Sequence, residues 1–302
     1  MKLGAANDAS EAWRRSLDNV QENGHWCDGV TDVTSVGSGF GDKPRRYLEV
    51  IADGVEINCP RKRIIGSEAR QFSMGFAVAN TIWAFSGSNK VEDIVRYNSR
   101  GKAFSGDGET FACSIGSRIF GPPSQYRAIL ERLKQDSSSR RACVVTLDRL
   151  DVLNPPKDTP CSIAIQFLLR LDKLHCVTFM RSQSALMVWP YDVFLFTMVQ
   201  ERLSLELDVK LGTYSHFCGS LHVYEDELDL LRTVAAEIPV NGSGTMPPME
   251  IPPIGFEVLV EFERTLRKST NPKRELVDAR AYLGDYWFQL LDPVADMLQH
   301  TM

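Results

Sequence analysis

The segment 180-MRSQSALMVWPYD-192 sets a guanidinium, hydroxyls, an amide and a carboxyl into a part of the chain that is otherwise apolar. A Pro-Cys pair at 160–161 precedes this segment, and the run 219-GSLHVY-224 follows it with two hydrogen-bonding rings. A nucleophile, a cation, a carboxylate and two polar rings therefore come from one stretch, 160–224. Polar groups are costly to bury without partners, so this clustering indicates a ligand site.

These side chains suit a nucleotide. A cysteine attacks as its thiolate, and a neighbouring arginine such as Arg181 favours the charged form of Cys161. The planar guanidinium also fits a phosphate monoester, with the Ser182 hydroxyl as a further donor. His222 and Tyr224 stand two apart in a predicted strand, so both side chains point to one face and can clamp a sugar hydroxyl.

Each residue also has an ordinary structural interpretation. Cys161 alone would be a buried thiol, because free cysteine is among the most buried residue types. Arg181 could form an internal salt bridge, and Asp192 could cap a helix that begins at Val193. The pair Arg140-Arg141 alone would be a solvated surface pair. The order and spacing of all the motifs together favour the site interpretation over these alternatives.

The motifs resemble those of the thymidylate synthase superfamily over residues 136–226. The gaps between Cys161, Arg181, Asp192, His222 and Tyr224 equal the family's gaps. The resemblance implies an α+β fold of the thymidylate-synthase type, a mixed sheet packed with helices, here with additional C-terminal helices. It also implies a homodimer, because 139-SRR-141 is similar to the family's arginine pair, which reaches a phosphate bound in the other subunit.

The same resemblance implies roles for individual residues. Cys161, Arg181 and Asp192 would be catalytic, and the substrate would be held by Arg140, Arg141, Arg181, Ser182, Gln183, Ser184, Asp192, His222 and Tyr224. The implied reaction moves a one-carbon unit from 5,10-methylenetetrahydrofolate to C5 of a pyrimidine nucleoside monophosphate, after Cys161 adds to C6. Folate-binding residues stay unassigned, because the family's folate-contacting aspartate aligns with Ser184 and its acid–base glutamate with Asn80.

Asp192 is the departure from the family that bears most on the substrate. Methylating members carry asparagine there, whose amide accepts from uracil N3–H and donates to O4. Cytosine presents the inverse pattern, and a carboxylic acid matches it, because its O–H donates to N3 while its carbonyl accepts from the amine. An ionised carboxylate could instead pair with cytosine protonated at N3. Asp192 thus resembles the cytidylate 5-hydroxymethylases of nucleoside-antibiotic pathways and phages.

Three functions are consistent with these residues. A cytidylate hydroxymethylase, in which water traps an exocyclic methylene, is the function that Asp192 favours. CMP is preferred to dCMP as its substrate, because the N-terminal departures and extra C-terminal helices resemble the nucleoside-antibiotic enzymes. A UMP or dUMP methylase would require Asp192 to be only a helix cap. A non-catalytic nucleotide-binding descendant would account for Asn80 and Ser184.

Composition is that of a globular protein. The 302 residues suffice for one large domain, and 43% hydrophobic and 24% charged residues are ordinary values. A net charge of -5 gives no general attraction to nucleic acid, so a small phosphate ligand is expected rather than a polymer. Seven cysteines without a CxxC pair predict free thiols, a reducing cytoplasm and no structural metal. Apolar runs stay below the roughly 20 residues of a membrane helix, and no signal peptide is expected.

The hydrophobic pattern also predicts the order of the elements. Helices are expected over 8–22, 67–85, 124–134, 193–205, 256–266 and 279–298. Strands are expected over 47–57, with a turn near Asp53-Gly54, and over 143–147, 161–169, 175–181 and 209–224. The glycine-rich stretch 35–42 predicts a loop leading to Arg45 and Arg46, either of which could contact phosphate. We divide the chain into a catalytic domain, 1–240, and a linker with a helical extension, 241–302, packed on that domain.

Overall fold

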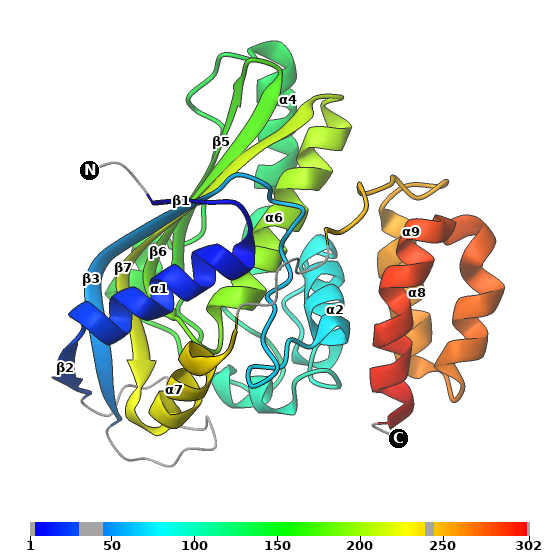
Figure 1. Cartoon of the computed structure of the whole chain (residues 1–302). Helices are drawn as coiled ribbons and strands as arrows, with labels where there is room; N and C mark the ends of the chain where they lie inside the picture. Colours follow the sequence, from blue (N-terminus) through cyan, green and yellow to red (C-terminus); the bar gives the residue numbers. More distant parts are fainter. Residues whose placement is uncertain (1–3, 30–44, 239–244, 301–302) are drawn as a thin grey trace.

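In a computed structural model, which describes residues 4–29, 45–238 and 245–300, a seven-stranded sheet forms the centre of the molecule (Figure 1). Its strands are β1 (Gly4–Ala6), β2 (His25–Asp28), β3 (Arg46–Ile57), β4 (Cys143–Val145), β5 (Ser162–Arg170), β6 (Lys173–Ser184) and β7 (Lys210–Tyr224). The order is β1-β3-β7-β6-β5-β4, and β2 pairs with β3 off this path. The pairs β1–β3 and β6–β7 are parallel and the others antiparallel, so the sheet is mixed, as predicted. The glycine-rich stretch 35–42 lies outside the described residues.

The structure also contains helices, some packed on this sheet and some packed only on other helices. They are α1 (Ala9–Asn23), α2 (Met74–Phe85), α3 (Ile115–Phe120), α4 (Gln125–Gln135), α5 (Arg149–Leu153), α6 (Trp189–Glu206), α7 (Leu228–Ala236), α8 (Glu257–Lys268) and α9 (Pro272–His300). The core helix α6 is buried on most sides and packs on β6 and β7, which is why its sequence is apolar nearly throughout. None of the helices in the described part of the chain combines the length and the apolar character needed to cross a membrane.

The predicted helix 67–85 begins later than its sequence pattern suggests. Ser73 caps α2 by accepting the backbone N–H of Phe76, and residues 67–73 are irregular. Arg70 is buried in that irregular segment and donates to the backbone carbonyls of Leu186 at 3.0 Å and Met187 at 2.9 Å. The segment therefore bends away from a helix to brace the turn that precedes α6.

The turn predicted near Asp53-Gly54 is wrong, because β3 runs through both residues and pairs with β7 on either side of them. Ala52 adopts a left-handed φ of 63°, which makes a local irregularity in the strand without reversing it. The Asp53 carboxylate accepts from Ser16 at 3.1 Å and Asn19 at 2.7 Å, both on α1. The Asp-Gly pair thus anchors a helix to the sheet and does not close a hairpin.

The C-terminal helices lie beside α2 (Figure 1). Gly75 of α2 makes their approach possible, because a Cβ there would stand 2.6 Å from atoms of Pro293 and Met297. The predicted helix 279–298 is part of α9, which starts at Pro272 and is broken at Gly284, where φ is 79°. The described part of the predicted linker is docked and not free: Met246 is buried, and its N–H donates to the Arg61 carbonyl at 3.2 Å.

Candidate active site

Cys161 stands just before β5 and is exposed, so the interpretation as a buried structural thiol is wrong. Arg181, near the end of β6, holds the turn that presents it. The Arg181 N–H donates to the Cys161 carbonyl at 2.7 Å, and its guanidinium donates from Nε to Pro160 at 2.9 Å and from Nη2 to Thr159 at 3.1 Å. Among the described residues Arg181 forms no ion pair, which also removes the internal salt bridge. The Arg181 guanidinium is thereby fixed against the backbone just before Cys161.

Asp192 is not a helix cap. Helix α6 begins at Trp189, so Asp192 lies inside its first turn, and the residue at the capping position, Val188, makes no side-chain capping bond. The Asp192 carboxyl instead accepts from Gln183 Nε2 at 3.0 Å. Burial raises the pKa of Asp192 to about 6, an effect that the Gln183 hydrogen bond reduces only in part. The carboxyl therefore keeps its proton to a higher pH than an ordinary aspartate, up to about pH 6.

Gln183 is the partner that fixes this carboxyl. Only 2% of Gln183 is exposed, and its Oε1 has no hydrogen-bond partner among the described residues. A buried acceptor without a donor costs free energy, so such atoms mark places that a ligand or water completes. The Gln183 amide directs its nitrogen at Asp192, and its oxygen points away from that carboxyl.

His222 and Tyr224 share one face of β7, as predicted, with ring centroids 5.0 Å apart. His222 pairs in register with Ser184 of β6, which brings it to the same end of the sheet as Arg181. Burial lowers the pKa of His222 below its usual value, and neither the Ser220 backbone nor the Glu49 charge, which both raise it, reverses the shift, so the neutral ring prevails at pH 7. A neutral imidazole can both donate and accept, as a sugar hydroxyl requires.

Arg45, and not Arg46, is the N-terminal arginine that reaches this site. Its guanidinium carbon lies 3.6 Å above the Tyr224 ring, and it pairs with Asp226 at 2.5 Å. Arg46 points elsewhere: it lies 4.6 Å above the Trp26 ring and forms its ion pairs at the exposed surface.

The predicted residues of strands β5, β6 and β7 and of helix α6 converge on one place. Ser182 pairs in register with Ser220, two residues before His222. Near Ser220 in β7, burial raises the pKa of the Cys218 thiol to about 12, an effect that the hydrogen bond to the Ser220 carbonyl reduces in part.

Arg140 and Arg141 are not part of that cluster. Both are exposed, and they line a separate cleft of about 420 Å³ between α4 and β4. The other residues that line it are Arg132, Gln135, Asp136, Ser138 and Ser139. Three arginines in one cleft suit an anion, and none of the residues around Cys161 contributes to it.

Two further predicted positions have local roles. The Ser184 hydroxyl accepts the Met187 N–H at 3.3 Å and so stabilises the turn before α6. Asn80 lies half-buried within α2. Sequence reasoning missed Arg70, whose guanidinium lies 5.3 Å from the Tyr191 ring and supports the start of α6. No pattern could have found it, because the segment around it reads as helix.

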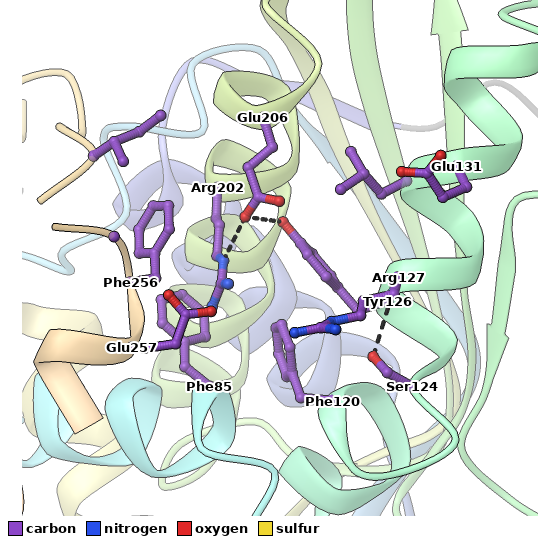
Figure 2. Close-up of a pocket in the computed structure, with 13 residues that line it drawn as sticks. Phe85, Phe120, Ser124, Tyr126, Arg127, Glu131, Arg202, Glu206, Phe256 and Glu257 are labelled. Carbon is purple, nitrogen blue, oxygen red and sulfur yellow. Dashed lines mark hydrogen bonds and ion pairs between the residues drawn. The ribbon is translucent and has the colours of Figure 1, made fainter. Parts of the chain in front are cut away.

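A second cavity, of about 520 Å³, lies between α4, α6 and the C-terminal region (Figure 2). Arg202 crosses it between aromatic rings, 4.2 Å from the Phe256 centroid and 4.7 Å from that of Phe85. Glu206 accepts from Arg202 at 2.8 Å and from the Tyr126 hydroxyl at 3.0 Å. The Arg202–Glu206 pair is thus satisfied within the cavity and among its aromatic rings, which is typical of a structural joint.

A family model described as Thymidylate synthase matches residues 78–252, more than half of the chain. The chain belongs to the thymidylate synthase family. The match includes all the strands from β4 to β7 and helix α6, which carry the residues around Cys161, and it ends before α8.

Several members of this family resemble the chain. The deoxyuridylate hydroxymethyltransferases of Bacillus phage SP01 and Delftia phage PhiW-14 are 27% and 29% identical over 67% and 62% of this chain. The chain spans 57% of the length of each of these phage proteins. A putative thymidylate synthase of Methanosarcina barkeri is 27% identical over 77% of this chain and 94% of its own length.

A solved structure, thermostable thymidylate synthase A from Bacillus subtilis, superposes with a TM-score of 0.65 at 20% identity. The superposition covers 77% of this chain and 85% of that one. The predicted thymidylate-synthase-like fold is thereby confirmed.

Proposed function

We propose that this protein transfers a one-carbon unit from 5,10-methylenetetrahydrofolate to C5 of a cytosine nucleoside monophosphate, giving the 5-hydroxymethyl product. We assign this activity to the core, 1–240, and treat 241–302 as an extension of it. The observation that carries the proposal is Asp192: a carboxyl inside the first turn of α6, held by Gln183 and with a pKa raised to about 6. Family membership supports one-carbon chemistry, and Asp192 supports cytosine.

The hydrogen bond from Gln183 gives the two oxygens of Asp192 different roles. Oδ2 already accepts from Gln183, so it acts as the carbonyl oxygen, and the proton of the neutral acid belongs on Oδ1. The Oδ1 hydroxyl can then donate to cytosine N3, while the second lone pair of Oδ2 accepts from the exocyclic amine. Uracil offers a donor and an acceptor in the opposite places and leaves both oxygens poorly matched.

The residues then have the following roles in the proposed reaction. The Cys161 thiolate forms a bond to C6, and Asp192 gives its proton toward N3 as negative charge develops on the ring. C5 bonds to the one-carbon unit and loses its proton, and tetrahydrofolate departs and leaves an exocyclic methylene. Water adds its oxygen to that methylene while the Cys161–C6 bond breaks, so the sum is nucleotide, methylenetetrahydrofolate and water giving hydroxymethyl nucleotide and tetrahydrofolate.

A second candidate is hydroxymethylation of a uracil nucleotide. The names of the phage relatives favour it, since these proteins are deoxyuridylate hydroxymethyltransferases. It requires an ionised Asp192 that accepts from uracil N3–H. The same names point to a deoxyribose, whereas the departures from the family at both ends of the sequence favour CMP. The assay therefore compares ribonucleotides with deoxyribonucleotides.

We further propose that the active unit is a homodimer in which Arg140 and Arg141 bind the phosphate held by the other chain. Their cleft lies apart from Cys161, and the sheet exposes an apolar pair, Phe179 stacked on Phe217 at 5.6 Å, suited to a second copy. Mixing the inactive variants Cys161→Ser and Arg141→Ala should restore activity after chain exchange. No recovery despite demonstrated exchange would mean that each site is complete within one chain.

The assay for the proposed function combines the protein with methylenetetrahydrofolate and CMP, dCMP, UMP or dUMP separately. Mass spectrometry of the nucleotides should show the addition of CH2O to a cytosine nucleotide. A methylated product with release of dihydrofolate would identify a methylase, and hydroxymethylation of only the uracil nucleotides would identify the second candidate. Binding of all four without any product would identify a non-catalytic protein.

A further inference from the structure

A compact group of three different metal-binding side chains lies at the edge of the sheet, where β2 pairs with β3. His25 and Cys27 are two apart in β2, so their side chains share one face. Glu49 of β3 is paired in register with His25 and projects to that same face. An imidazole, a thiol and a carboxyl therefore meet on a rigid two-stranded element.

The spacing of their ligand atoms is that of a metal site. His25 Nε2 lies 3.5 Å from Glu49 Oε2, Cys27 Sγ lies 3.4 Å from the same oxygen, and all three ligand atoms lie within 4.8 Å of one another. Bonds of about 2.0 to 2.3 Å to a tetrahedral zinc ion place neighbouring ligands about 3.4 Å apart. Two of the three edges already have this length, so a metal ion requires only a small rotation of His25 or Cys27.

We propose that His25, Cys27 and Glu49 bind one divalent transition-metal ion, for which Zn²⁺ is the best match. Imidazole, thiolate and carboxylate together are borderline-soft ligands that suit zinc and exclude Mg²⁺ and Ca²⁺, which take oxygen ligands. The His25 side chain is 54% exposed, which leaves a path for the ion and a fourth position for water.

The surroundings hold the carboxylate in the orientation that the ion needs. The Ser220 hydroxyl of β7 donates to Glu49 Oε1, which leaves Oε2 to face His25 and Cys27. Such an outer hydrogen bond orients a ligand and tunes its affinity. Ser220 precedes His222 by two residues, so the ion would fasten β2 through β3 to the strand that carries the proposed sugar-binding residues.

The sequence predicts no structural metal, and the arrangement of the three ligands accounts for the difference from this proposal. That prediction used spacings within one segment, such as CxxC, whereas these ligands come from two strands and meet only through their pairing. In the alternative interpretation, the thiol of Cys27 and the ring of His25 simply hydrogen-bond to Glu49 at an exposed edge. The two interpretations differ in whether the group binds zinc.

The test is a titration of the full-length, metal-free protein with Zn²⁺ in competition with a chromophoric chelator. Wild type should bind one ion per chain, and Cys27→Ser should weaken binding at least about tenfold to a hundredfold. Cys143→Ser is the control, because it removes a thiol that is at least as accessible and lies outside the group, and it should leave binding unchanged. With Co²⁺ as the probe, wild type should show thiolate-to-cobalt absorption that Cys27→Ser lacks.

Equal zinc affinity of wild type and Cys27→Ser, or no binding at micromolar Zn²⁺, would overturn the proposal. If Cys27→Ser does not fold, His25→Gln provides the same comparison at a more exposed position. The readout is metal binding and not turnover, so its outcome is independent of the proposed one-carbon chemistry.

Discussion

Two polar groups of this molecule, one buried and one partly buried, differ in how fully their hydrogen bonds are satisfied. Beneath α8, Glu263 accepts from Tyr97 at 2.7 Å and from Arg267 at 2.8 Å, and Arg267 also pairs with Asp93 at 2.9 Å. At the end of the sheet, the Asp192 carboxyl has one neutral donor, Gln183, whose own Oε1 has no partner in the described part of the chain.

This difference indicates that the group around Glu263 has a structural role and that the pair Asp192–Gln183 binds a ligand. The network around Glu263 is complete, so it needs nothing from outside, and it joins α8, beyond the family match, to Asp93 and Tyr97 within it. The pair Asp192–Gln183 is incomplete, so a ligand with the right donors and acceptors would be stabilised there. Buried polar groups that are left under-satisfied are typical of binding and catalytic sites.

The largest effect is expected where the nucleophile is removed. Cys161→Ser should lower kcat by at least about a thousandfold, because a hydroxyl is far less ionised than a thiol, while nucleotide affinity should stay close to wild type. Mass spectrometry of the product measures the loss of turnover, and calorimetry measures the nucleotide affinity. Turnover at a tenth of the wild-type rate would remove Cys161 from the mechanism.

In the complete network, the expected effect is on stability alone. Arg267→Met leaves Glu263 buried without its cation and should lower the free energy of unfolding by about 3 kcal/mol in denaturant titrations. Arg264→Met on the same helix is the control, because its pair with Glu261 is exposed and should contribute less than about 1 kcal/mol. A change in base preference from Arg267→Met would break the comparison between the two regions.

At the incomplete site, base preference should depend on pH. The pKa of Asp192 is raised to about 6, so the neutral acid that matches cytosine is present below that pH and is lost above it. The ratio of kcat/KM for cytosine over uracil nucleotides should therefore be constant at low pH and fall by up to about tenfold per pH unit above 6. Titration of Cys161 cancels in this ratio. A ratio that is flat from pH 5 to 8 would contradict the role of the proton.

A smaller effect should follow from Gln183→Leu. The hydrogen bond from Gln183 lowers the pKa of Asp192, so its loss should move the inflection of the same ratio to higher pH. Gln200→Leu is the matched control: another buried glutamine of the core, it donates to the Leu174 and Thr213 carbonyls and should leave the inflection in place. An unmoved inflection in Gln183→Leu would show that Gln183 does not tune the carboxyl.

Much of the fold could be predicted because its determinants are local or lie at fixed spacing. Between Cys161 and Tyr224 the hydrophobic pattern predicts three strands and the core helix in the correct order. The spacing of the polar motifs within this run indicates the family. The predicted start of α6 at Val193 is wrong, because the helix begins at Trp189 and Pro190 lies in its first turn, a position that proline suits.

Contacts between distant segments could not be predicted. Arg70 braces a turn that lies 116 residues away in the sequence, and its surroundings read as helix. The choice between Arg45 and Arg46 depends on the ring of Tyr224, which only strand pairing brings near. Propensity and periodicity carry no information on such contacts.

The central claim, that Asp192 selects the base, is tested most directly by kcat/KM for CMP, dCMP, UMP and dUMP in wild type and Asp192→Asn. An amide presents the donor and acceptor that uracil needs, and each mismatched buried group costs about 1 to 3 kcal/mol. The account predicts that the variant loses roughly tenfold to a hundredfold on cytosine nucleotides and gains on uracil nucleotides. An unchanged ratio between the two bases would contradict it and leave Asp192 a structural residue.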